Sequence, residues 1–100
     1  MVDVPIFAPV PLTRIRELAE AILQQRLAEF GFSGLSAMES VDSDGTSVVV
    51  LRARYNGTRE PSPTKALDAE VAIQRALYAL GDDRTIHLFH ELPGDDMDAE

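Results

Sequence analysis

The chain has 100 residues, 45% of them hydrophobic and 26% charged, which is the usage of one ordinary globular domain rather than of a disordered or membrane-embedded chain. Its formal net charge of -8 would repel a polyphosphate, so nucleic acid is not an expected partner. The chain has no cysteine, which excludes disulfides and thiolate metal sites.

The first segment, residues 1–11, is an arm that contains three prolines. Because proline lacks an amide donor and fixes φ, this arm is predicted to be extended or, at most, an edge strand. It would expose Ile6, Phe7 and Val10, which could lie across a partner subunit. The alternative is that the arm folds back as an edge strand over its own sheet.

A helix is predicted to follow, with Thr13 as its N-cap and Gly31 as its stop. From Ile15 to Phe30 the apolar residues recur on one broad arc at about 100° per residue. Arg26 projects near the middle of this arc. It is therefore expected either to reach water along the edge of the layer or to meet a buried acid such as Glu70.

Residues 32–41 and 46–55 alternate in polarity and predict two antiparallel strands. The pair Asp44-Gly45 between them is a strong hairpin signal, because type I′ turns need positive φ at both central positions. In the second strand, alternate residues face opposite sides of the sheet. One side is apolar and predicts core, whereas the other side is mixed and carries Val48, Val50, Arg52 and Arg54.

A second helix is predicted to begin with Ser62 as N-cap and Pro63 at the first helical position, and to end at Gly81. This helix has two apolar faces. One is rich in small residues and suits close packing on a sheet. The other could pack on the first helix or on another chain, and it carries Leu67, Val71 and Tyr78.

A third strand is predicted over residues 84–91, and the acidic tail at 93–100 is expected to be disordered. The elements then run helix, strand, strand, helix, strand across a single domain at residues 12–92. This α-β-β-α-β order predicts an α+β two-layer sandwich in which both helices cover one face of the sheet. A first strand supplied by the arm would turn it into a ferredoxin-like βαββαβ sandwich.

The two histidines, His87 and His90, have a spacing that would chelate a metal from a helix. In a strand they face opposite sides, so they are not expected to share an ion without a bulge. The stretch from Ser40 to Gly45 matches the start of a calcium loop, but its twelfth place holds Leu51 in place of the bidentate glutamate. We therefore predict no cofactor.

One locally basic region surrounds the amino end of the second helix, where free amides and the macrodipole favour an anion. The alternative is that these residues serve only as N-cap chemistry and solvated charge. No nucleophile elbow is present, and no spacing of carboxylates picks an acid/base pair, so the sequence names no catalytic residue. The anion-binding candidates are Arg59, Ser62, Thr64 and Lys65.

The sheet face opposite the helices would be apolar in part and flanked by charge, and such a patch typically marks an interface. We hypothesise a non-catalytic protein-interaction or regulatory module that forms a homo-oligomer, such as a two-fold dimer, or joins another protein in a larger assembly. The candidate interface residues are Ile6, Phe7, Val48, Val50, Arg52, Arg54 and Phe89.

Two alternatives stay open at this point. One is a small ligand- or metal-sensing domain that uses the amino end of the second helix or the pair His87 and His90. The other is an enzyme of an unfamiliar type. Since no apolar run approaches the roughly 18 residues of a spanning helix and the amino terminus does not match a signal peptide, a cytoplasmic location and no membrane partner are expected.

The order of elements and the histidine-bearing strand at residues 86–90 resemble the cytoplasmic domain of cation-diffusion transporters, and also ferredoxin-like regulatory modules. The resemblance implies a fold that commonly dimerises and senses rather than catalyses. The membrane half of the transporters is missing, and no additional histidine completes a metal site. We identify no family from this resemblance.

Overall fold

The computed structural model describes residues 9–57 and 59–93. The predictions made for residues 1–8, with Ile6 and Phe7 among them, and for the tail from residue 94 lie outside this part of the chain. The elements follow the predicted order: α1 (Leu12–Leu27), the short 3-10 helix η1 (Ala28–Phe30), β1 (Phe32–Val41), β2 (Ser47–Tyr55), α2 (Pro63–Ala79) and β3 (Thr85–Glu91).

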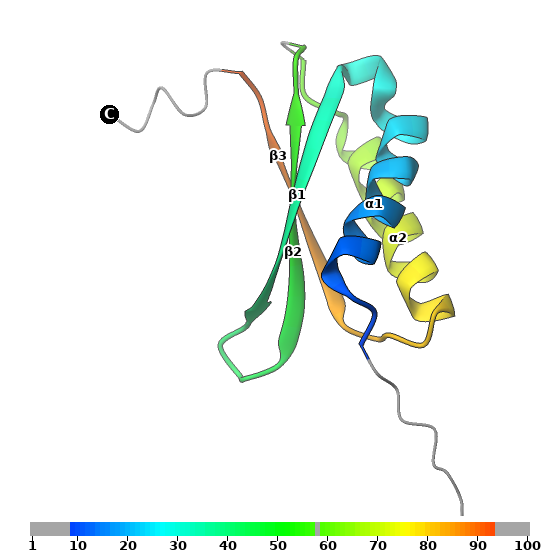
Figure 1. Cartoon of the computed structure of the whole chain (residues 1–100). Coiled ribbons are helices and arrows are strands. Elements are labelled where there is room, and N and C mark those ends of the chain that lie inside the picture. The colour runs from blue at the N-terminus through cyan, green and yellow to red at the C-terminus, as the bar shows by residue number, and fades with distance from the viewer. Residues whose placement is uncertain (1–8, 58, 94–100) are drawn as a thin grey trace, which may run out of the picture.

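The two helices lie side by side on one face of a three-stranded sheet, and the opposite face carries no described element (Figure 1). The strand order is β1-β2-β3, with β1 antiparallel to β2 and β3 parallel to β2. Helix α2 is therefore the crossover of a parallel βαβ unit. The predicted α+β class with two layers is confirmed.

The ferredoxin-like order is not confirmed. In that split βαβ topology the first strand lies between the two strands that flank the second helix. Here β2 and β3 are direct neighbours, with Leu51 opposite Leu88, so no strand separates them. Residues 9–11 form no strand.

Helix α1 begins earlier than predicted, and the assignment of Thr13 as N-cap is wrong. Pro11 is the N-cap, with ψ at 144°, and its carbonyl accepts the N–H groups of Arg14 and Ile15 at 3.0 Å each. The fixed φ of Pro11 suits the start of a helix, and proline has no side-chain acceptor. The helix therefore starts without a side-chain cap. The predicted stop is confirmed, since Gly31 follows η1 with φ at 83°.

The predicted hairpin is confirmed, but its turn is not type I′. Gly45 has φ at 88°, whereas Ser43 and Asp44 keep negative φ. The backbone carbonyl of Asp42 accepts the N–H of Gly45 at 3.0 Å, and its Oδ1 accepts the N–H of Thr46 at 3.1 Å. The Asp42 side chain thus closes the loop, and a single left-handed residue is enough.

The core lies between the helices and the sheet face that was predicted to be apolar. The alternate residues of β2 and their helical partners are almost fully buried, and the small residue Ala69 is among the buried residues of α2. Ser62 is the N-cap of α2, as predicted, and its Oγ accepts the N–H of Lys65 at 3.2 Å. The largest fully buried side chains are Ile15, Leu23, Leu27, Val49, Leu51, Ile73, Leu77 and Ile86.

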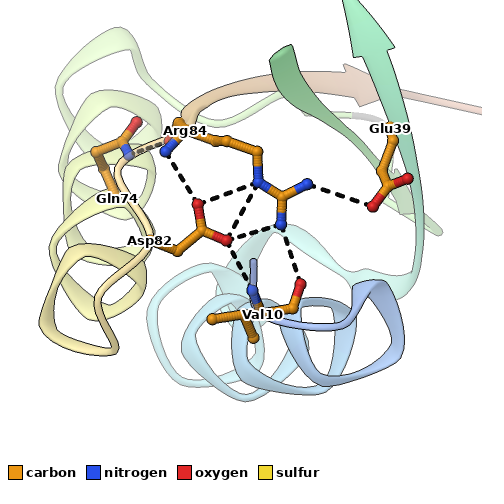
Figure 2. Close-up of polar contacts among 5 residues, drawn as sticks. All are labelled: Val10, Glu39, Gln74, Asp82 and Arg84. Atoms are coloured by element: carbon orange, nitrogen blue, oxygen red, sulfur yellow. Dashed lines mark hydrogen bonds and ion pairs between the residues drawn. The ribbon is translucent and has the colours of Figure 1, made fainter. Parts of the chain in front are cut away.

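A buried ion pair closes the end of the core at which β3 begins (Figure 2). Asp82 is 4% exposed, and its Oδ2 lies 2.7 Å from Arg84 Nη2. The same Oδ2 accepts the backbone N–H of Val10 at 2.9 Å, and Arg84 Nη2 donates to the carbonyl of Val10 at 3.0 Å. The pair therefore ties the segment before α1 to the segment before β3, although the two are 72 residues apart along the chain.

The same network also reaches β1 and α2. Arg84 Nη1 lies 3.3 Å from Glu39 Oε2, and Gln74 Nε2 donates to the carbonyl of Arg84 at 2.7 Å. Hydrogen bonds from the Arg84 side chain outweigh the effect of burial and hold the pKa of Asp82 at about 2, below its ordinary value of 3.8. The carboxylate thus stays ionised at ordinary pH, and all its contacts are structural.

Candidate functional site

The candidate site is the sheet face that the helices leave uncovered. Strand register and alternation place Gly34 and eleven residues with side chains on this face, which we call the open face. It includes every interface candidate that the structure describes. The open face consists of Gly34, Ser36, Met38, Ser40, Val48, Val50, Arg52, Arg54, Thr85, His87, Phe89 and Glu91.

An apolar row crosses the open face. Met38 is directly opposite Val50 in the register, and Phe89 lies on β3 two residues beyond His87, which is the residue opposite Val50. Met38 is 51% exposed and Phe89 is 48% exposed, whereas Val50 between them is half-buried. Val48 is 3% exposed, so it has little surface to offer a partner. The accessible apolar surface is thus formed by Met38, Val50 and Phe89.

Charged groups flank this row and are partly satisfied within the face. The Arg52 guanidinium lies 5.4 Å from the centre of the Phe89 ring, and its Nη1 is 3.4 Å from Glu91 Oε2. Arg54 makes no ion pair with any described residue. Two arginines against one glutamate give the open face a slight positive charge, in a chain whose net charge is -8.

The arm leaves the described domain next to one end of the open face. A hollow of about 340 Å³ there is lined by Pro9, Ser40 and Val48, with Arg84 at its side. Pro9 is the first described residue, and Val10 after it is held by the Asp82 carboxylate. The described part of the chain therefore begins beside one end of the open face.

The anion-binding candidates do come together at the amino end of α2, but the chain's own groups occupy most of them. The Ser62 hydroxyl serves as the N-cap acceptor, and Lys65 Nζ lies 3.5 Å from Glu29 Oε2. The Arg59 guanidinium lies 4.8 Å from the centre of the Phe30 ring. Only Thr64 is exposed without such a contact. The arrangement matches capping and solvated charge better than an open anion pocket.

The two histidines lie on opposite faces of β3, as the alternation predicted. His87 is opposite Val50 on the open face, and His90 is opposite Ala53 on the side of the helices. Within residues 9–57 and 59–93, no group of three or more histidine, aspartate or glutamate side chains is arranged to hold a metal ion.

A contact that sequence reasoning missed joins His90 to Tyr55. Tyr55 Oη lies 2.6 Å from His90 Nδ1, and the two ring centres are 5.6 Å apart. Burial lowers the pKa of His90, against the attraction of Glu70 and Glu60, and burial also raises the pKa of Tyr55. Both side chains are therefore neutral at pH 7, at the carboxyl ends of the two parallel strands. The alternation of side chains along β2 and β3 places Tyr55 and His90 on the core side of the sheet, and this pattern could have indicated the contact.

The lowered pKa of His90 predicts a pH-dependent stability. The folded state favours the neutral imidazole of His90. When the pH falls below about 6.5, the ordinary pKa of histidine, the unfolded chain therefore binds more protons than the folded chain does. The free energy of unfolding should therefore decrease as the pH falls from about 7.5 through the ordinary pKa of about 6.5, and this pH dependence should be smaller in His90→Gln. Urea unfolding at several pH values measures both. His87→Gln is the matched control, and an equal loss of pH dependence in that variant would contradict the assignment.

No protein-family model matches the chain, and neither the search of curated proteins nor the search of solved structures found a match. The resemblance in element order to transporter domains thus gains no support. None of the helices that the structure describes is long and apolar enough to cross a membrane. Function has to be inferred from the surfaces that the fold presents.

Proposed function

We propose that the chain is a small non-catalytic protein-interaction module that self-associates through its open face. The observation that carries the proposal is the exposed apolar row of Met38, Val50 and Phe89 across all three strands. Contiguous apolar surface on a small domain is more often an interface than a substrate site. A two-fold arrangement would bury this row against its own copy.

The distribution of charge favours a second copy as the occupant. Two chains with a net charge of -8 each repel one another over most orientations. The open face is an exception, because it carries Arg52 and Arg54 against Glu91 alone. In a two-fold pairing the arginines of one copy can approach the glutamate of the other. Association through the open face is thus opposed less by electrostatic repulsion than association through most of the acidic surface.

The area of the open face limits how tight such a dimer can be. Three strands spaced by about 4.8 Å and a length of roughly 23 Å give about 330 Å² for each copy. A standard stable interface buries about 800 Å² for each partner. The sheet alone would therefore support a weak dimer. Ile6 and Phe7 of the arm, which lie outside the described residues, would add apolar area to this interface.

Size-exclusion chromatography with light scattering tests the proposal at tens of micromolar chain. The expected mass is about twice the 11.0 kDa of one chain. Phe89→Glu and Met38→Glu should each weaken the dimer at least ~10-fold while circular dichroism shows the fold retained. Val50→Glu should do the same, and because this residue is half-buried in the central strand, a thermal melt must accompany it.

Tyr78→Glu is the matched control, since Tyr78 is an exposed apolar residue at 69% on the helix side of the molecule. It should leave the mass unchanged. Deletion of residues 1–8 should weaken the dimer if the arm contributes. A monomer at all concentrations, or an equal loss with Tyr78→Glu, would overturn the open face as the self-association surface.

The described contacts offer less support for the alternative of a ligand- or metal-sensing domain. Its two candidate sites are the amino end of α2 and the pair of histidines. Lys65 and Ser62 at the first are engaged by groups of the same chain, and His87 and His90 face apart. A thermal shift on addition of zinc or inorganic phosphate would favour this alternative.

A further inference from the structure

The outer surface of the two helices carries a groove that the open face does not involve. The second apolar face of α2 does not pack on α1: Leu67 is 59% exposed and Val71 is 39% exposed. These two residues line a groove of about 500 Å³ together with Ala72, Arg75 and Asp68 of α2 and Arg26 of α1. The groove thus combines an apolar floor with charged walls.

The groove is cationic in a chain that is strongly acidic. Arg26 and Arg75 form no ion pair with any described residue, so both guanidinium groups remain available. Lys65 joins Arg26 in an adjoining hollow of about 220 Å³, and among the described residues that line either cavity Asp68 is the only one with a carboxylate. An occupant with the opposite charge and at least one apolar side chain would satisfy both the guanidinium groups and the apolar floor.

Segment 94–100 of the same chain has that chemistry. It carries four acidic residues around one long apolar side chain, Met97, and contains no basic residue. Methionine adapts its shape to irregular apolar floors. Several cations elsewhere are engaged, because Arg52 is paired with Glu91, Arg84 with Asp82 and Arg16 with Glu20. Arg54 on the open face has no ion pair with a described residue either, but no groove with an exposed apolar residue is found beside it among the described residues.

The segment starts at the end of the domain where the groove begins. Strand β3 is parallel to β2, and β2 leads into α2, so the carboxyl end of β3 and the amino end of α2 lie at the same end of the sheet. Lys65 and Asp68, near that amino end, line the adjoining hollow. Seven extended residues span about 23 Å, while the groove from Lys65 to Arg75 runs about 15 Å along α2. The segment is long enough to pass over the amino end of α2 and enter.

We propose that the acidic segment 94–100 docks in cis into the groove between α1 and α2, with its carboxylates on Arg26 and Arg75 and Met97 over Leu67 and Val71. The groove is then a binding surface for acidic segments with an apolar anchor, and its first occupant is the chain's own tail. Partners that use the helix side would have to displace this segment. The inference is independent of self-association through the open face.

Amide chemical shifts of the full chain and of a chain that ends at Pro93 test the proposal. All core residues of the described fold remain in the shorter chain. Truncation should shift the amides of Leu67, Val71 and Arg75, and about 1 M salt should remove the difference by screening. A synthetic peptide of residues 92–100 added to the truncated chain should reverse the shifts.

Charge-reversal variants give the matched comparison. Arg26→Glu and Arg75→Glu in the full chain should remove the shift difference at Leu67 and Val71, whereas Arg54→Glu on the open face should leave it unchanged. Three results would overturn the proposal: no shift in the groove on truncation, shifts confined to the neighbourhood of Arg52 and Arg54, or shifts that grow with chain concentration. The last would mean that a second copy supplies the segment.

Discussion

Asp82→Ala should lower the free energy of unfolding by about 3–5 kcal/mol, which is a large part of the stability of a small domain. The change removes the carboxylate but leaves the Arg84 guanidinium at the core margin, with its side chain only 12% exposed. It also leaves the N–H of Val10 without its acceptor. Among the described residues, only the exposed Glu39 then compensates the charge of Arg84, and this weaker pairing and the lost anchor of Val10 both destabilise the fold. Denaturant unfolding measures the difference from the parent chain.

The free energy of unfolding should also depend on pH through the ionisation of Asp82. The pKa of Asp82 is about 2 in the folded chain, against 3.8 for a free carboxyl. A depressed pKa contributes stability above the unfolded value and loses it as the pH falls through the folded value. About 2 kcal/mol should therefore disappear between roughly pH 4 and pH 2 in the parent chain, and not in the variant.

Asp83→Ala is the natural control for both measurements. Asp83 is the next residue along the chain and is exposed, so its removal should change stability by less than about 0.5 kcal/mol. A second comparison replaces both members of the pair, with Asp82→Leu and Arg84→Met, and should be less destabilising than Asp82→Ala alone. If Asp82→Ala and Asp83→Ala had equal effects, the anchoring role of the pair would be refuted.

Periodicity predicted the elements because helix and strand periods are properties of neighbouring residues. The order of elements and the ends at Gly31 and Ser62 follow from local chemistry and were correct. The N-cap at Thr13 and the type I′ turn were wrong because competing local groups, Pro11 and the Asp42 side chain, satisfied the same backbone donors. A residue type that suits an N-cap does not prevent the helix from starting at a residue nearby, as it does here at Pro11.

Contacts between distant residues could not be predicted in this way. The pairing of β3 directly with β2 decides between a ferredoxin-like sheet and the observed one, yet no local pattern records which strand is adjacent. The Asp82 carboxylate meets Val10 across 72 positions, and the Tyr55 hydroxyl meets His90 across 35. Alternation did predict which residues of β2 and β3 share the open face, because every strand has the same period of two, but it did not single out Met38 of β1.

Gly31→Ala should lower the free energy of unfolding by about 2–4 kcal/mol, for two separable reasons. Gly31 has φ at 83°, a conformation that costs a residue with Cβ roughly 1–2 kcal/mol. In addition, a Cβ at this position would lie 2.7 Å from the backbone N of Gly57, where no flexible side chain can move away. The carbonyl of Gly31 also accepts the N–H of Asn56 at 2.7 Å, so the two segments cannot separate freely.

Gly45→Ala isolates the first of these effects. Gly45 has nearly the same φ, 88°, but a Cβ there would meet no atom within 4 Å. This variant should lose only about 1 kcal/mol, the cost of the left-handed backbone alone. The excess loss in Gly31→Ala then measures the contact between the start of β1 and the loop that leads from β2 into α2. Equal losses in the two variants would show that the backbone of Gly57 moves away from a Cβ at position 31 at little cost in free energy. Close backbone packing would then not stabilise the contact between the start of β1 and the loop before α2.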